Sequence, residues 1–397
     1  MKQAVILAAG EGKRLRPFTV NKPKAMLSIA GKPILQYVVE SLVQNGVREI
    51  VLVVGYRQEQ IFDYMASGEQ FGVEITYVTQ AGQLGTAHAL LQAKSAVNEE
   101  FLVLPGDKLI EADTITQFVA AKPEAMLVKK VENPLRSAVV TVDDGVVKEA
   151  MRQERRASGP IREPGIYIVN TGIYAFTGEI FDFIEGEPNI PAALNRMLAQ
   201  GKKISALETE ATWLDIVYPW DILSLNGAVL SRIQAKIGGT IEAGVSTKGL
   251  VSVAENTVIK SNSYIVGPVV IGRGCEIGPN VCILPATSVG DNVVISPFTE
   301  IENSVIGNDV TIGPGSIIQD SVIDRGCLIT GHFTASSGEV EVKIEQHHLV
   351  KVGAMLGEGC SLGSNVVALP GVIAGNYTQV QALKLISGQL PDRSLVF

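Results

Sequence analysis

The chain has 397 residues, of which 46% are hydrophobic and 19% are charged, and its formal net charge is −8. That length exceeds one ordinary domain and the composition is globular, so we expect two domains. The acidic balance excludes a broad nucleic-acid surface, because binding to a phosphate backbone needs clustered Lys and Arg. It leaves room for a small basic pocket that takes a phosphorylated metabolite.

The N-terminus begins like a signal peptide but does not continue as one. Its apolar run is short and is followed at once by the charged residues Glu11, Lys13 and Arg14. No apolar run in the sequence is long enough to span a membrane. We therefore expect a cytoplasmic protein with no membrane partner.

Short apolar runs alternate with helical stretches in the first half of the chain. The apolar runs and the helical stretches between them are at residues 3–9, 34–45, 50–55, 58–67, 73–79, 87–96 and 101–105. This alternation predicts βαβ units, and therefore an α/β domain with a mainly parallel sheet covered by helices. Sheets of this kind bind ligands beyond the carboxyl ends of their strands.

From about residue 241 an aliphatic residue recurs at every sixth position. One run is Ile265, Ile271, Ile277, Ile283, Val289, Ile295 and Ile301, a second is Ile306, Ile312 and Ile318, and a third is Ile323 and Ile329; after an interruption come Leu356, Leu362, Ala368 and Ala374. A period of six fits neither a helix nor simple strand alternation. It predicts a coil of short parallel strands, three per turn, with one aliphatic side chain of each hexad pointing inward. The pattern resembles the hexapeptide-repeat family, which implies a left-handed parallel β-helix.

The four cysteines form no CxxC pair and no metal-ligand spacing with His. Cys275, Cys327 and Cys360 each come four residues after an inward aliphatic residue, a place that Val281 and Thr287 take in other hexads. We interpret these three as small packing residues at corners.

The stretch 221–237 has helical spacing and contains one glycine. We therefore divide the chain into a first domain at 1–224, a linking helix at 225–240 and a β-helix domain at 241–397.

A glycine-rich turn, Gly10-Glu11-Gly12-Lys13-Arg14, follows the first predicted strand. Backbone N–H groups in such a turn can approach phosphate oxygens closely, and the basic side chains add charge. Leu15 stands where the dinucleotide fingerprint needs a third Gly, and the GK[ST] of a P-loop is absent. The turn therefore indicates a phosphate site of another kind.

The string from Leu7 to Thr19 reads L-A-A-G-x-G-x-R-L-x-P-x-T and is followed by Lys22-Pro23-Lys24. This combination resembles the signature of the sugar-1-phosphate nucleotidylyltransferases, and the resemblance covers nearly the whole chain. It implies a Rossmann-like nucleotidyltransferase domain that uses Mg²⁺. Carried onto this sequence, it implies that Arg14 and Lys24 are catalytic and that the nucleotide is bound by Leu7, Ala8, Ala9, Gly10, Gly12 and Lys13.

The string Gln83-Leu84-Gly85-Thr86-Ala87-His88-Ala89, with Gln80 three positions before it, resembles the nucleobase loop of the uridyltransferases. It implies that Gln80, Gly85 and Thr86 contact the base, whereas we expect His88 to pack in the following helix. A Gln amide both donates and accepts hydrogen bonds at a pyrimidine edge.

Two acidic residues are candidates for a metal site. Asp107 follows the predicted strand 101–105, and a carboxylate at a strand end is well placed to hold Mg²⁺ against phosphates. Asp215 lies in a W-x-D string with Pro219 and Asp221 that also resembles the family. The resemblance implies that both hold the metal ion and that Asp107 is catalytic.

The sugar side of the site departs from the family pattern. Asn170-Thr171-Gly172 resembles the family's sugar-contact string, so Asn170 and Gly172 are candidates. The family's Tyr-Gly is replaced by Ser137-Ala138, and Arg152 stands where a Glu is expected. Either Glu154 and Arg155 substitute for that Glu with a small shift, or the sugar differs from that of the family.

The β-helix of bifunctional relatives transfers acetyl from acetyl-CoA to glucosamine 1-phosphate. Their G-x-G-T-x-x-A-N string is eroded here to residues 330–337, but His332 remains as a candidate base. His347 and His348 fit an ordinary solvated loop. The insertion at 336–350 breaks the period, and an open β-helix is commonly covered by forming a trimer, so we expect a homo-oligomer, a trimer or higher.

The resemblance is closest to the archaeal bifunctional uridyltransferase/acetyltransferase type and to glucose-1-phosphate thymidylyltransferase-like proteins. It implies an enzyme that joins a nucleoside triphosphate to a sugar 1-phosphate and releases pyrophosphate. UTP with N-acetylglucosamine 1-phosphate is the first choice, and dTTP or UTP with glucose 1-phosphate is the alternative. An acetyltransferase whose first domain only binds, and a non-catalytic regulatory or scaffold subunit, are the alternatives of other classes.

Overall fold

The computed structural model describes residues 1–132, 138–152 and 165–397. The chain divides into two compact units. The first comprises Met1–Glu11, Lys22–Met26 and Ile34–Asp215, and the second comprises Gly12–Asn21, Leu27–Pro33 and Ile216–Phe397. Two short segments from the N-terminal part of the sequence therefore belong to the second unit.

Within the described residues, the first unit contains a nine-stranded sheet in the order β5-β4-β1-β6-β11-β8-β12-β10-β9. In that order the strands are Glu74–Thr79, Glu49–Val54, Gln3–Leu7, Glu100–Pro105, Tyr167–Thr177, Ala125–Val131, Ser205–Glu208, Val146–Arg152 and Val139–Asp143. β5, β4, β1 and β6 run parallel, as the βαβ alternation predicts. β11 pairs antiparallel with β6, and the sheet beyond it is mixed.

Helices cover both faces of this sheet. α1 (Ile34–Gln44), α2 (Gln58–Met65) and α4 (Ala112–Val119) share a core with one face. α3 (Thr86–Gln92), α5 (Phe181–Ile184) and α6 (Ile190–Ala199) share a core with the other. A strand buried on both faces is apolar at consecutive positions, which explains the continuous runs in the sequence.

Short elements complete the first half of the chain. They are the 3₁₀ turns η1 (Lys13–Leu15), η2 (Lys24–Met26), η3 (Glu69–Phe71) and η4 (Gly178–Ile180), and the pairs β2 (Ser28–Ile29) with β3 (Lys32–Pro33) and β7 (Lys108–Ile110) with β13 (Trp213–Asp215). The second pair brings two distant segments of the first unit together.

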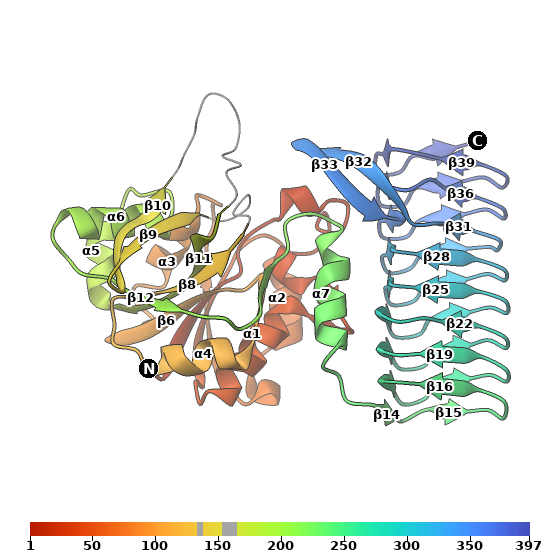
Figure 1. Ribbon diagram of the computed structural model, residues 1–397, viewed down its shortest axis with the longest axis horizontal. Coiled ribbons are helices and arrows are strands. Elements are labelled where there is room, and N and C mark those ends of the chain that lie inside the picture. Colours follow the sequence, from red (N-terminus) through yellow and green to blue (C-terminus); the bar gives the residue numbers. More distant parts are fainter. Residues whose placement is uncertain (133–137, 153–164) are drawn as a thin grey trace. The chain divides into compact units, whose positions relative to one another are not determined.

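Residues 236–397, all of which are described, form a parallel β-helix with three stacked columns of strands, interrupted by one inserted hairpin, as Figure 1 shows in green to blue. The first column is β14 (Lys236–Ile237), β17 (Val251–Val253), β20 (Val269–Ile271), β23 (Thr287–Val289), β26 (Val305–Ile306), β29 (Val322–Ile323), β34 (Ala354–Leu356), β37 (Val372–Ala374) and β40 (Gln389–Leu390). The second is β15 (Thr240–Ile241), β18 (Val258–Ile259), β21 (Glu276–Ile277), β24 (Val294–Ile295), β27 (Thr311–Ile312), β30 (Leu328–Ile329), β35 (Ser361–Leu362), β38 (Gln379–Val380) and β41 (Leu395–Val396). The third is β16 (Ser246–Lys248), β19 (Tyr264–Val266), β22 (Cys282–Ile283), β25 (Glu300–Glu302), β28 (Ile317–Gln319), β31 (Thr334–Ala335), β36 (Val367–Ala368) and β39 (Leu385–Ile386).

One aliphatic side chain of each hexad fills the interior of the coil. Ile259, Ile277, Ile295 and Ile312 lie above one another in the second column and are buried. Burying one such side chain contributes about 1.5–3 kcal/mol, so the repeated row stabilises the β-helix along its length. The predicted architecture, an α/β domain followed by a β-helix with three parallel strands per turn, is confirmed.

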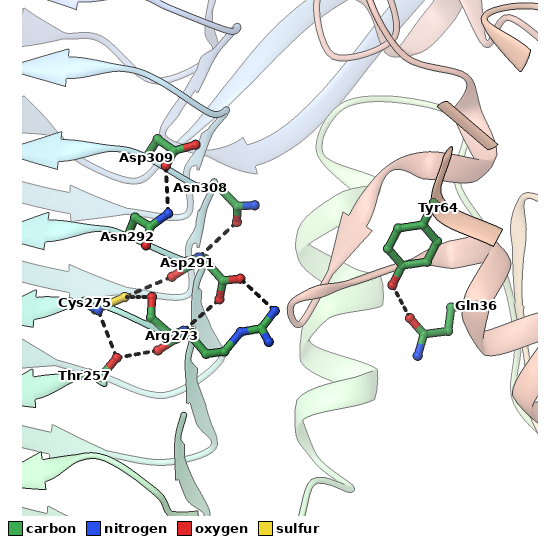
Figure 2. A network of polar contacts seen from close by, with 11 residues as sticks. Gln36, Tyr64, Thr257, Arg273, Cys275, Asp291, Asn292, Asn308 and Asp309 are labelled. Carbon is green, nitrogen blue, oxygen red and sulfur yellow. Dashed lines mark hydrogen bonds and ion pairs between the residues drawn. The ribbon is translucent and has the colours of Figure 1, made fainter. Parts of the chain in front are cut away.

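Polar side chains join successive coils at one edge of the β-helix (Figure 2). Asp291 Oδ1 accepts a hydrogen bond from Arg273 N at 2.7 Å, and Asn308 Oδ1 accepts one from Asp291 N at 3.0 Å. These bonds satisfy backbone N–H groups at corners where the strand pairing is interrupted.

The cysteines of the β-helix are packing residues. Cys275, Cys327 and Cys360 are buried free thiols whose Sγ atoms donate to a carbonyl oxygen 3.1–3.2 Å away. Each carbonyl belongs to a glycine, and the three bonds repeat one pattern at the corners. The interpretation of these cysteines from the sequence is confirmed.

The helix that precedes the β-helix is shorter than the sequence indicates. α7 spans Asp221–Leu230, so the expectation of a helix to residue 237 is wrong. Lys236 and Ile237 pair with Ser252 and Val253 as the first strand of the β-helix. Strand pairing therefore overrides the helical spacing.

The insertion that breaks the hexad period is an antiparallel hairpin, β32 (Gly338–Ile344) with β33 (Gln346–Val352). His347 and His348 lie in β33, so the expectation of a loop is wrong, although His347 is exposed to solvent as expected. His347 Nδ1 lies 2.9 Å from Glu341 Oε1, and the His348 ring centroid lies 4.2 Å from that of Tyr218. Alternating apolar residues, including the buried Val342, give the segment a period of two that favours a strand.

Among the described residues, no helix has both the length and the apolar character that crossing a membrane requires.

Candidate functional site

The carboxyl ends of the parallel strands meet at one edge of the first sheet. Backbone pairing continues just past these ends, where Gln80 N donates to Val54 O at 2.8 Å and Gly106 N donates to Leu7 O at 2.9 Å. A Cβ on Gly106 would lie 3.0 Å from Ala8 Cβ, so this close approach favours glycine. The strand ends therefore hold the following turns in fixed positions.

A cavity of about 380 Å³ opens at this edge. The residues lining it that the sequence predicts for nucleotide, metal or sugar are Leu7, Ala9, Gly10, Gln80, Gly85, Thr86, Asp107 and Gly172. Its other lining residues are Gln83, Ala89, Pro105, Lys108, Tyr174 and Ile190. Ala8, also predicted, is buried in the core instead. The volume suits a small organic ligand.

The predicted nucleobase loop is held by contacts of its own side chains. The buried Gln80 donates through Nε2 to Gly85 O at 3.0 Å and lies 3.0 Å from His88 Nδ1. Thr86 Oγ1 accepts from Ile190 N at 3.1 Å, which ties the start of α3 to the start of α6. The amide nitrogen of Gln80 is thus engaged within the protein.

Gly85 occupies a position that other residues would not tolerate. Its φ is +98°, and a Cβ there would lie 1.9 Å from Pro188 O. The loop can approach the segment before α6 only because this side chain is absent.

Four charged side chains gather beside the cavity. Lys24 Nζ lies 2.6 Å from Asp107 Oδ2 and 3.6 Å from Asp215 Oδ1. Lys108 Nζ lies 3.3 Å from Asp215 Oδ2. The structure therefore brings together Lys24, Asp107 and Asp215, which are far apart in the sequence.

The charges hold one another in their ionised forms. Burial alone would lower the pKa of Lys24, but the carboxylates of Asp107 and Asp215 outweigh it and raise that pKa. Burial alone would raise the pKa of Asp107, but the ammonium groups of Lys24 and Lys108 hold it below its usual value.

The two acids fit a divalent cation. Asp107 and Asp215 both face one ammonium group, and Asp215 Oδ1 is buried without a hydrogen-bond partner. The described residues contain no group of three or more His, Cys, Asp or Glu side chains suited to a metal ion. Mg²⁺ is commonly held by one or two carboxylates together with water and substrate phosphates, so two carboxylates suffice.

On the predicted sugar side, Asn170 is buried and already bonded. Its Nδ2 donates to the Tyr174 hydroxyl at 2.9 Å, and its Oδ1 accepts from Gly172 N at 2.8 Å. These bonds place Gly172 and Tyr174 at the cavity wall. Ala138 contributes only a backbone carbonyl, which accepts from Asn170 N. Glu154, Arg155 and Ser137 lie outside the described residues.

The basic part of the signature turn belongs to the second unit. Gly12 has a φ of +71° and precedes η1, and Thr19 Oγ1 donates to its carbonyl oxygen at 2.8 Å. Arg14 Nε lies 2.6 Å from Oε2 of Glu345, at the tip of the hairpin. Neither Gly12, Lys13 nor Arg14 lines the cavity described above.

His332 is exposed at a corner of the β-helix. Its φ is +50°, and a Cβ on Gly315 would lie 2.6 Å from its Nδ1, so the ring rests over that glycine. No ion pair of this imidazole occurs among the described residues.

Sequence reasoning missed Lys108 and Tyr174 as cavity residues. The sequence does contain one indication for Lys108, because it is a basic residue that directly follows the Gly-Asp at a strand end. Its importance depends on the pairing of β7 with β13, which no local pattern indicates.

Known proteins resemble the chain along its whole length. Residues 3–232 match the nucleotidyl transferase family, and residues 250–285, 268–303 and 286–320 match the bacterial transferase hexapeptide (six repeats). The chain is 34% identical over 419 residues to the bifunctional protein GlmU of Methanococcus maripaludis strain S2, across 99% of this chain and 97% of that relative.

Two other relatives differ in their names. The chain is 32% identical over 401 residues to a bifunctional sugar-1-phosphate nucleotidylyltransferase/acetyltransferase of Sulfurisphaera tokodaii, across 95% of each chain. It is 33% identical over 341 residues to the low-salt glycan biosynthesis nucleotidyltransferase Agl11 of Haloferax volcanii, across 82% of this chain and 93% of that relative.

Proposed function

Since the chain belongs to the nucleotidyl transferase family, we propose that it joins a pyrimidine nucleoside triphosphate to a sugar 1-phosphate and releases pyrophosphate. The first choice of substrates is UTP with N-acetylglucosamine 1-phosphate, which gives UDP-N-acetylglucosamine. The loop Gly85–Ala89 and the names of the GlmU relatives support this choice. dTTP or UTP with glucose 1-phosphate is the alternative.

One observation carries the proposal. Lys24 Nζ lies within 3.6 Å of a carboxylate oxygen of both Asp107 and Asp215. Asp107 lines the adjacent cavity together with Gly10, Gln80 and Thr86. A cationic side chain and two carboxylates beside a cavity that a glycine-rich turn also lines are suited to bind a polyphosphate and its metal ion.

The reaction is a direct displacement at phosphorus. A phosphate oxygen of the sugar 1-phosphate forms a bond to the α-phosphorus. The bond from that phosphorus to the oxygen bridging the α and β phosphates breaks, and pyrophosphate leaves with the electron pair. No bond to the protein forms, so the protein contributes positioning and charge neutralisation.

Each residue group has a separate task in this scheme. Asp107 and Asp215 would hold Mg²⁺, which supplies charge neutralisation at the phosphates when bound. Lys24 and Arg14 bring positive charge to the triphosphate, and the amides of the Gly10–Gly12 turn bind its oxygens. Gln80, Gly85 and Thr86 contact the base, and Asn170, Gly172 and Glu154 are proposed for the sugar.

A substrate panel tests the proposal. UTP, dTTP, CTP and ATP are each combined with N-acetylglucosamine 1-phosphate or glucose 1-phosphate, with and without Mg²⁺, and pyrophosphate release is measured. We expect the fastest Mg²⁺-dependent release with UTP and N-acetylglucosamine 1-phosphate. Nucleotide binding without pyrophosphate release in any combination would favour a non-catalytic regulatory or scaffold role.

A second activity, acetyl transfer from acetyl-CoA to glucosamine 1-phosphate, is supported by the name of the Sulfurisphaera relative and by the exposed His332. The amine nitrogen forms a bond to the acetyl carbonyl carbon, the carbon–sulfur bond breaks, and coenzyme A leaves as the thiol. His332 would take the proton from the amine.

His332→Ala tests this activity, with His347→Ala on the hairpin as the matched control. We expect thiol release from acetyl-CoA to be lost in the first variant and kept in the second. Equal rates in both variants would remove His332 from the reaction.

The β-helix is proposed to assemble into a homotrimer or larger homo-oligomer. Tyr264, Ile317, Val367 and Leu385 point outward in the third column, and each is exposed. The same row also contains Cys282, Glu300 and Thr334, so the apolar positions are interspersed with polar ones. A second copy of the chain would cover these exposed apolar side chains. Light scattering on the intact protein and on Leu385→Glu tests this, and a monomeric native protein contradicts it.

A further inference from the structure

The charged cluster beside the cavity is electrically balanced. Lys24 and Lys108 supply two positive charges, and Asp107 and Asp215 supply two negative charges. All four side chains are largely buried, with exposed fractions between 15% and 28%. Charges in such a setting are screened much less than surface charges.

Lys108 is held in its place by the local strand pairing. It lies directly opposite Asp215 in the antiparallel pair of β7 and β13, so the two side chains are cross-strand neighbours. Its ammonium group also lies 4.3 Å from the centroid of the Trp213 ring, two residues along the opposite strand. A cation over an indole ring is attracted to it, so this charge has two partners.

The pairing also orients Asp215. Lys108 contacts Oδ2 at 3.3 Å, while Oδ1 is turned toward Lys24 and has no hydrogen-bond partner. The remaining oxygen, Asp215 Oδ1, therefore faces the Lys24 ammonium group, which Asp107 also contacts.

A divalent cation gains little from a cluster whose charge is already zero. To reach Asp107 and Asp215 it must come close to two ammonium groups, which repel it. A triphosphate changes this balance, because its oxygens offer the two lysines another anionic partner and free the carboxylates.

We propose that Lys108 is a positioning residue that, together with Lys24, keeps the Asp107–Asp215 site closed to free divalent cations. The metal ion then enters together with the triphosphate, and Lys108 passes from Asp215 to the phosphates as it does so. This inference rests on the proposed function for the identity of the incoming ligand.

Manganese binding to the nucleotide-free, full-length protein tests the proposal. Free Mn²⁺ is titrated by electron paramagnetic resonance, using the native protein, Lys108→Met and Lys108→Arg. Met keeps the aliphatic stem over Trp213 and removes the charge, whereas Arg keeps the charge. Lys130→Met is the matched control, because Lys130 pairs with Glu208 at 2.9 Å outside the cavity.

We expect Lys108→Met to bind Mn²⁺ at least tenfold more tightly than the native protein, and the Arg and Lys130 variants to match the native protein. With the native protein, added UTP should increase the affinity for Mn²⁺ at least tenfold, after the Mn²⁺ bound by UTP without protein has been subtracted. If Lys108→Met does not fold, by circular dichroism, Lys108→Gln replaces it.

Two results would overturn the proposal. One is native protein that binds free Mn²⁺ as tightly as the charge-removing variant, and the other is weaker binding in that variant. Since these titrations need no turnover, their outcome is independent of the substrate panel. If the Mn²⁺ affinities are as expected but no substrate combination releases pyrophosphate, the proposed function is refuted and this inference stands.

Discussion

Asn21 donates a hydrogen bond from Nδ2 to Oε2 of Glu358 at 3.0 Å, across 337 positions of sequence. Glu358 Oε1 accepts two more, from Arg325 at 2.7 Å and from Tyr377 at 2.9 Å. Burial alone would raise the pKa of Glu358, but these three donors hold it below its usual value of 4.5. The carboxylate thus joins the segment Gly12–Asn21 to the last coils of the same unit.

Glu358→Gln should lower stability at pH 7 by about 1–3 kcal/mol, because three donors lose a charged acceptor. A carboxyl group with a lowered pKa stabilises the fold above its ordinary pKa, and that contribution is lost as the pH falls through the folded-state pKa. The native protein should therefore lose stability below about pH 4.5 more steeply than the variant. Urea unfolding at pH 7 and pH 4 measures both effects, with the exposed Glu339→Gln as the control. A variant as stable as the native protein at pH 7 would refute the assignment.

Asp107→Ala should lower the rate of Mg²⁺-dependent pyrophosphate release about 10²–10³-fold or more, because one of the two proposed metal ligands and the ion-pair partner of Lys24 are lost. The circular dichroism spectrum should stay native. Asp143→Ala changes an exposed carboxylate on β9 and should leave the rate unchanged. Near-normal turnover in the Asp107 variant would count against the metal assignment.

Gly85→Ala should distort the loop proposed to bind the nucleobase, since the new Cβ would lie 1.9 Å from Pro188 O at a φ of +98°. We expect the KM for the nucleotide to rise at least tenfold, an effect of about 1.4 kcal/mol or more. Gly82→Ala is the matched control in the same loop, because its nearest contact would be an ordinary 3.7 Å from Leu84. Equal KM values in the two variants would show that the loop does not need this approach.

Ile312→Ala should destabilise the β-helix by about 2–5 kcal/mol, because it leaves a cavity in the stacked row. The neighbouring Thr311 points outward, and Thr311→Ala should change stability by less than about 0.5 kcal/mol. Urea unfolding of the two variants, followed by circular dichroism, compares them directly. A similar loss in both would contradict the inward and outward assignment.

Much of this protein is readable from local sequence. The six-residue period identifies the inward rows between Ile265 and Ala374, because each hexad must bury one side chain whatever its neighbours do. The signature string around Gly10 and the strand-end Gly-Asp at 106–107 indicated the family, which the match over residues 3–232 confirms. Such signals survive because they depend on residues close together in the chain.

Tertiary structure decided the rest. Strand pairing ends α7 at Leu230 and turns the insertion into a hairpin, and the pairing of β7 with β13 sets Lys108 against Asp215. The segment 12–21 carries the signature arginine, yet its partners Glu345 and Glu358 come from more than 300 residues away. No local pattern encodes such contacts, because their energy exists only once distant segments have been brought within hydrogen-bonding distance.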